Sequence, residues 1–167
     1  MLVEKDDWKL AIEDARVRHA AVVNLILSAE AQAMNLLRLY VTVATATAAG
    51  SATAFSSTVA ALPWAAGYGL SVATLCFVVG AYYCFLTMRS ATINLPGRGA
   101  EFWLWSLHEN VDRTDVFRTY LENLKIKTEM NNAVNNSNAK NFRYAKQFGM
   151  AAPLFALIVG VIAAWAA

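Results

Sequence analysis

The sequence predicts an all-α integral membrane protein with three transmembrane helices, the first and third extended into the cytoplasm as long helices that form an oligomeric bundle. Two observations predict the spans. The run between Arg38 and Arg89 carries no charged residue and is about twice the roughly 20 residues that one span needs. The uncharged run from Phe148 to Ala167 has the length of a third span. The third observation is that a seam of mostly apolar residues leads into each of these runs at alternating spacings of four and three, as in a packed helix.

Residues 1–38 are expected to form the cytoplasmic N-terminal helix, which begins near Asp6 or Asp7 and enters the first span without a break. Acidic residues in a first turn suit the helix dipole. From Lys9 to Arg38 such a helix extends about 45 Å at 1.5 Å per residue. Its seam consists of Trp8, Ile12, Ala15, His19, Val22, Ile26, Ala29, Ala33, Leu36 and Tyr40.

Two polar residues on this helix stand out. His19 lies on the seam, and a buried structural histidine is favoured there over a proton sensor, because only the intrinsic titration range of histidine argues for the sensor. Glu30 lies among alanines and leucines close to the membrane, where an unpaired carboxylate is costly. We therefore expect Glu30 to have a cationic partner, and the candidates are Arg38, Lys140 and Arg143.

The first span is assigned to residues 39–62 and the second to residues 63–88, with Pro63 at the turn of a membrane hairpin. The first limb is rich in alanine and hydroxyl residues, and two compatible interpretations follow. Small residues allow close packing of helices, and hydroxyls along one face can line a pore by replacing part of an ion's water shell. The pore-lining candidates are Thr42, Thr45, Thr53 and Ser56. The second limb is bulkier and holds Cys76 and Cys84, which we assign to packing.

Residues 89–111 are expected to form a turn followed by an aromatic segment. The cluster Asn94-Leu95-Pro96-Gly97-Arg98-Gly99 favours a turn that ends the second helix. The stretch from Glu101 to Leu107 contains Phe102, Trp103 and Trp105. It is interpreted as a short interfacial helix or as a plug packed against the long helices, interfacial anchoring being the usual role of tryptophan beside a membrane.

Residues 112–147 are expected to form the second cytoplasmic helix, which feeds the third span at residues 148–167, where Trp165 is the interfacial aromatic. The stretch from Asn131 to Asn138 is rich in asparagine, which favours a loop by propensity. A continuous helix is preferred, because the asparagines fall on the seam and polar seam positions fix register. This seam consists of Phe117, Leu121, Leu124, Thr128, Asn131, Asn135, Asn138, Phe142, Ala145 and Gly149.

The distribution of charge predicts topology and narrows function. Every lysine and arginine lies before Leu39 or between Arg89 and Lys146, so the positive-inside rule predicts that the N-terminus is in the cytoplasm and the C-terminus on the opposite side of the membrane. No catalytic constellation, metal-spaced cluster or phosphate loop is present, so the chain is not expected to be an enzyme or to hold a metal or cofactor. Acidic residues alternate with the basic ones after Asp112, which argues against nucleic acid as a partner.

Residues near the membrane resemble short motifs of a known family. Glu30, Ala31, Gln32 and Ala33 are similar to a pattern of an acidic residue, a spacer, a lysine and an alanine, with Gln32 in place of the lysine. Lys140, Phe142, Arg143 and Ala145 are similar to the pattern before the last span. On these motifs and on its whole architecture, the chain resembles the small transmembrane effectors of bacterial Pycsar anti-phage systems and, more distantly, SLATT membrane effectors. The resemblance implies a defence effector that damages the inner membrane in response to a nucleotide signal, with a cyclic nucleotide as ligand.

Three classes of function remain open: a signal-gated effector that disrupts the membrane or forms a pore, a holin-like pore former, and a membrane scaffold that recruits a cytosolic partner. Two seams on one short chain expose more apolar surface than one helix pair covers, so the expected partners are the lipid bilayer and further copies of the chain. The ligand-binding or gating candidates are Glu30, Gln32, Lys140 and Arg143. A pairing of Glu30 with Lys140 or Arg143 is expected to hold the first span in one rotation.

Overall fold

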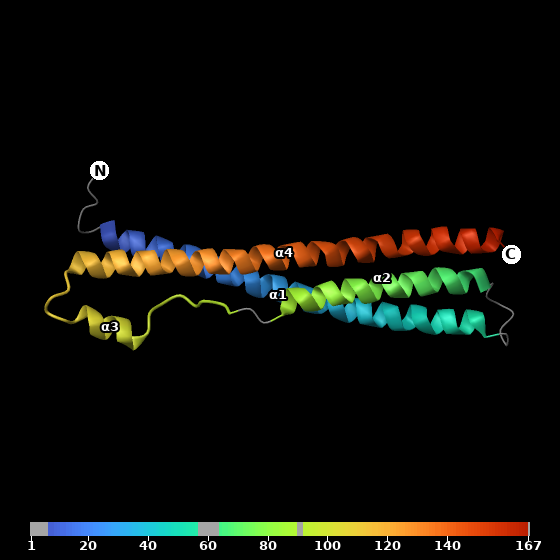
Figure 1. Ribbon diagram of the computed structural model, residues 1–167, viewed down its shortest axis with the longest axis horizontal. Helices are drawn as coiled ribbons and strands as arrows, with labels where there is room; N and C mark the ends of the chain where they lie inside the picture. Colours follow the sequence, from blue (N-terminus) through green and yellow to red (C-terminus); the bar gives the residue numbers. More distant parts are fainter. Residues whose placement is uncertain (1–6, 57–63, 90–91, 167) are drawn as a thin grey trace. The chain divides into compact units, whose positions relative to one another are not determined.

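The protein is described by a computed structural model that covers residues 7–56, 64–89 and 92–166. Four helices make up the described part: α1 (Asp7–Phe55), α2 (Trp64–Met88), α3 (Ala100–Ser106) and α4 (Arg113–Trp165). No strand occurs in these ranges, so the all-helical class is confirmed (Figure 1). The expected turn at Pro63 lies outside the described residues.

Three of these helices are long and apolar enough to cross a membrane. They are α1, α2 and α4, which match the three spans predicted from sequence. The two long helices are also uninterrupted, since α1 has 49 residues and α4 has 53. The prediction that each of these two helices is continuous is therefore confirmed.

The helix α4 runs through the asparagine-rich stretch without a break, so the preferred helical alternative is confirmed there. Asn131 and Asn138 are buried, as their seam positions predict. On α1 the seam residues His19, Ile26 and Ala33 are buried as well. Seam periodicity thus identified the packed face of both long helices, although residues of poor helix propensity occupy part of it.

The chain divides into two compact units. The first unit contains residues 7–28 of α1, the segment 92–99, α3 and the part of α4 up to residue 136. The second unit contains residues 29–55 of α1, α2 and the part of α4 from residue 137. The second unit holds most of the uncharged sequence, and we call it the membrane unit.

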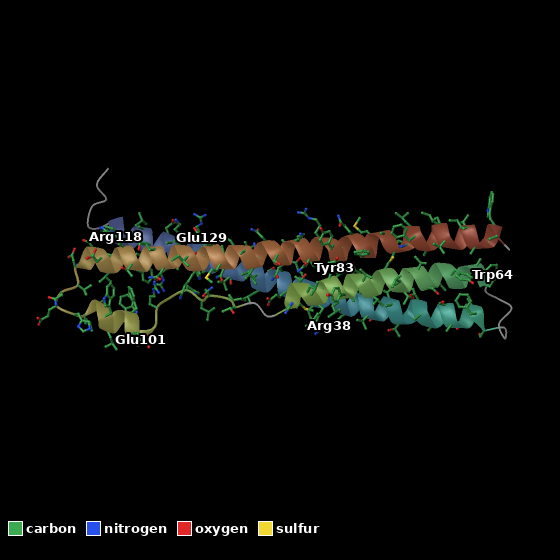
Figure 2. The ribbon with its side chains drawn as sticks, in the orientation of Figure 1. Arg38, Trp64, Tyr83, Glu101, Arg118 and Glu129 are labelled. Carbon is green, nitrogen blue, oxygen red and sulfur yellow. The ribbon has the colours of Figure 1, made fainter. Side chains whose placement is uncertain are left out.

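The membrane unit packs α2 beside the later halves of α1 and α4 (Figure 1). Its buried core is the cluster of Tyr40, Cys84 and Ala145, one residue from each helix. Aromatic contacts extend this core, because Tyr83 of α2 stacks on Phe148 at a ring-centroid distance of 5.7 Å and meets Tyr144 at 5.3 Å. Figure 2 labels Tyr83 between α2 and α4.

The first unit packs α3 and the early parts of α1 and α4 through aromatic rings. Trp8 of α1 stacks on Phe117 of α4 at 5.5 Å, and Phe102 of α3 meets Tyr120 of α4 at 6.1 Å. The aromatic segment is therefore a seven-residue helix that contacts a long helix through the Phe102 ring, an arrangement compatible with both the plug and the interfacial alternative. The expected turn before it is present, with Gly97 at a φ of 110° that favours glycine.

Candidate functional site

The outward face of α1 in the membrane unit carries the predicted pore-lining residues. Thr42, Thr45, Thr53 and Ser56 are all exposed. Each hydroxyl donates to a carbonyl of its own helix: Thr42 to Arg38 O at 3.0 Å, Thr45 to Val41 O at 2.8 Å, Thr53 to Ala49 O at 2.9 Å and Ser56 to Thr53 O at 2.8 Å. We call these four residues the hydroxyl face. In a single chain it points away from the packed helices.

A second set of hydroxyls faces inward and joins α1 to α2. The Thr47 and Thr74 hydroxyls lie 2.8 Å apart, and the Ser51 hydroxyl donates to Gly67 O at 3.0 Å. Ser51 also lies 2.7 Å from the Ser71 hydroxyl. The composition of the first limb alone does not separate this inward set from the hydroxyl face. The spacing of these hydroxyls does indicate the contact. Thr47 and Ser51 are four residues apart in α1, and Ser71 and Thr74 are about one turn apart in α2, so each pair lies on one face of its helix.

Close backbone approach joins α2 to α4. A Cβ added at Gly69 would lie 2.7 Å from Ala156 O, so only glycine fits the present spacing of the two helices. Beside this contact is a groove of about 430 Å³ whose lining is entirely apolar. Its lining comprises Ala65, Ala66, Gly69, Leu70, Ala156, Leu157, Gly160, Val161 and Ala164.

The predicted gating residues differ in their exposure to solvent. Glu30 is half-buried, whereas Gln32, Lys140 and Arg143 are exposed. The ion pairs of the described residues join Arg118 to Asp115 at 3.7 Å and Lys125 to Glu129 at 3.9 Å. The expected pairing of Glu30 with Lys140 or Arg143 does not form in this structure. A half-buried carboxylate still reaches water, so Glu30 does not require a cation.

A polar cluster at the centre of the first unit connects three segments of the chain. Asn131 of α4 binds both backbone groups of Asn94, accepting from its N–H at 3.0 Å and donating to its carbonyl at 2.9 Å. His19 of α1 also donates from Nε2 to Asn94 O, at 2.7 Å. Its Nδ1 lies 2.8 Å from the Thr128 hydroxyl. We call His19, Asn94, Thr128 and Asn131 the polar clasp.

The hydrogen-bond partners determine part of the protonation of His19. Because Asn94 O can only accept, Nε2 carries a proton. The Thr128 hydroxyl has one proton and two acceptors within reach, His19 Nδ1 at 2.8 Å and Leu124 O at 2.8 Å. The His19 and Asn131 side chains are both fully buried, in line with the structural role favoured for His19 from sequence. The clasp fixes the segment 92–99 between α1 and α4 within the first unit.

Two grooves flank the clasp in the first unit. One, of about 580 Å³, lies between α1 and Pro96 and is lined by Lys9, Glu13 and Arg16 among others. The other, of about 370 Å³, lies between α1 and α4 and is lined by Arg18, Lys125, Glu129 and Asn132 among others. Each groove carries two cations and one carboxylate, a composition suited to a small anionic ligand.

In the described part of the chain, no group of three histidine, cysteine or acidic side chains gathers as metal ligands would. Cys76 and Cys84 are buried free thiols. Comparison of the chain with family models, curated proteins and solved structures gives no match.

Proposed function

We propose that the chain is a membrane-disrupting or pore-forming effector of bacterial anti-phage defence, which assembles from several copies and responds to a nucleotide signal. The observation that carries the proposal is the outward direction of the hydroxyl face on a helix apolar enough to span a bilayer. This face lies on the outside of the membrane unit, so its surroundings are lipid, water or another copy of the chain.

The outer surfaces of α2 and α4 differ from the hydroxyl face of α1, and this difference supports a pore-lining role for α1. Exposed residues on α2 and α4 are bulky, including Leu75, Phe85, Leu157 and Ile162. Such side chains suit contact with lipid chains, whereas alanine, serine and threonine suit close helix contact or a wet lumen. We therefore orient α1 toward the axis of the assembly and α2 and α4 toward lipid. The distribution of basic residues supports an orientation in the inner membrane with the N-terminus in the cytoplasm and the C-terminus in the periplasm.

The nucleotide signal is assigned to the first unit. The groove lined by Arg18 and Lys125 joins two helices and offers an amide from Asn132, so a phosphate and a base can both find partners there. Lys140 and Arg143, the candidates suggested by the resemblance, are exposed and line none of the grooves described above. We keep them as secondary candidates that draw a phosphate by charge alone.

The test is dye leakage from vesicles that contain the purified protein, measured with and without a panel of cyclic nucleotides. Thr45→Leu and Thr53→Leu should each reduce leakage several-fold, because a bulky apolar residue narrows and dries a lumen. The matched control is Val78→Leu on the outer surface of α2, which should leave leakage unchanged. Equal leakage from all three variants would contradict the proposal that α1 lines the lumen.

Further outcomes separate the competing functions. Leakage that needs a nucleotide and is lost in Arg18→Ala and Lys125→Ala supports the gated effector. Leakage that no nucleotide alters indicates the holin-like alternative. Absence of leakage indicates the scaffold, for which exposed Trp103 and Leu104 of α3, at 52% and 65%, offer a contact surface for a partner.

A further inference from the structure

The side chain of Tyr40 lies where α1, α2 and α4 meet in the membrane unit. A Cβ at Gly80 of α2 would lie 2.7 Å from the Tyr40 ring, and one at Gly149 of α4 would collide with the Tyr40 hydroxyl. The ring therefore occupies a notch that exists because both positions are glycine. Only 5% of Tyr40 is exposed, and its hydroxyl donates to Ala145 O at 2.9 Å.

The stretch of α4 beside this notch has weakened backbone support. Pro153 lies inside α4 and has no N–H, so the carbonyl of Gly149 lacks its usual partner four residues on. Gly149 itself weakens a helix interior by roughly 0.5–1 kcal/mol relative to alanine. Sharp bends in helices occur at such proline sites. The Tyr40 hydroxyl thus holds α4 one turn before a built-in hinge.

We propose that Tyr40 is a latch: inserted between Gly80 and Gly149, it keeps α4 packed on α1 and α2, and its withdrawal lets α4 bend at Gly149–Pro153 and opens the core of the membrane unit. Withdrawal empties a space of aromatic size, which neither Gly80 nor Gly149 can fill because neither has a side chain. The inference does not depend on the proposed function.

A native cysteine of the chain can report this opening. Cys84 is fully buried in the same cluster as Tyr40 and Ala145, so a thiol reagent can reach it only when the three helices separate. The chain has two cysteines, and Cys76→Ala leaves Cys84 as the single thiol. The alkylation rate of Cys84 then reports the latch without any assay of leakage.

The experiment measures alkylation of Cys84 by N-ethylmaleimide in the full-length Cys76→Ala protein, in lipid nanodiscs at one fixed pH. Tyr40→Phe keeps the ring and removes only the hydroxyl, so it should raise the rate about fivefold, the effect of losing one net hydrogen bond. Tyr82→Phe on the exposed side of α2 is the matched control and should not change the rate.

The hinge is tested in the same background. Pro153→Ala restores the backbone donor to Gly149 O, so adding it to Tyr40→Phe should slow alkylation at least several-fold toward the parent rate. Equal rates for Tyr40→Phe and its parent would overturn the latch. A Tyr40→Phe rate that Pro153→Ala leaves unchanged would overturn the coupling to the hinge. Circular dichroism of each variant checks that helix content is kept.

Discussion

The Asn131 side chain pairs with both backbone polar groups of Asn94, through bonds of 3.0 Å and 2.9 Å. A single amide thereby satisfies a donor and an acceptor that sit outside any helix. Such backbone groups are costly to leave unpaired away from water. Asn131 is therefore a structural requirement of the first unit rather than a tolerated polar residue on an apolar seam.

Asn131→Leu should destabilise the first unit by about 2–4 kcal/mol, because it removes two hydrogen bonds and leaves the Asn94 N–H without its partner. Hydrogen exchange should show loss of protection at the Asn94 amide. Asn136→Leu, at an exposed position of the same helix, is the control. Unchanged protection at Asn94 in Asn131→Leu would contradict the pairing.

Asn138→Leu should have the opposite effect. Asn138 is buried, and its Nδ2 has no hydrogen-bond partner in the described part of the chain. Replacing an unsatisfied buried amide with an apolar group of similar size should stabilise the protein by about 1–2 kcal/mol. Thermal unfolding in detergent should show a Tm about 2–6 °C higher. A fall in Tm would mean that the Asn138 amide has a partner in the assembled protein.

The inward hydroxyls should be energetically coupled. Thr47→Val and Thr74→Val each remove one side of the contact between α1 and α2. A double-mutant cycle should give a coupling energy of about 0.6 kcal/mol, typical of such bonds between membrane helices. Pairing Thr45→Val with Thr74→Val supplies the control, since Thr45 belongs to the hydroxyl face and should show no coupling.

Gly69→Ala should force α2 and α4 apart. The added methyl group would lie 2.7 Å from Ala156 O, a backbone atom that cannot swing away as a side chain can. The expected cost is about 1–3 kcal/mol, seen as a lower Tm in detergent. Gly99→Ala is the matched control and should not carry this cost, because a Cβ at Gly99 meets nothing within 4 Å. Equal stability of the two variants would contradict the close approach.

The sequence predicted the helices well because their signals are periodic and local. The seam through His19 and Ile26 identified the packed face of α1, and the asparagines of α4 fell on its seam even though propensity alone would have made them a loop. Uncharged length was enough to locate three candidate spans.

The contact partners of individual residues were harder to predict than the buried faces of the helices. Periodicity places Asn131 on a seam but gives no reason to choose Asn94, which lies 37 residues earlier in an irregular segment. The expected ion pair of Glu30 failed for a related reason. Opposite charges at matching depth attract only weakly when water reaches them, so depth alone does not decide a contact. The notch that holds Tyr40 depends on two glycines from different helices, and no single stretch of sequence reveals it.

The internal hydrogen bonds of the hydroxyl face bear on the order in which copies of the chain insert and assemble. Thr42, Thr45 and Thr53 already donate to carbonyls of α1, so each of these hydroxyl donors keeps a hydrogen-bond partner when hydrocarbon surrounds the helix. Their oxygens nevertheless keep a free lone pair for water. Under the proposed function, these internal bonds let a single chain enter the bilayer before it meets other copies, and the same surface can later contact water without rearranging its hydrogen bonds. The proposal therefore makes insertion and opening two separate steps, with the encounter between copies in the plane of the membrane between them.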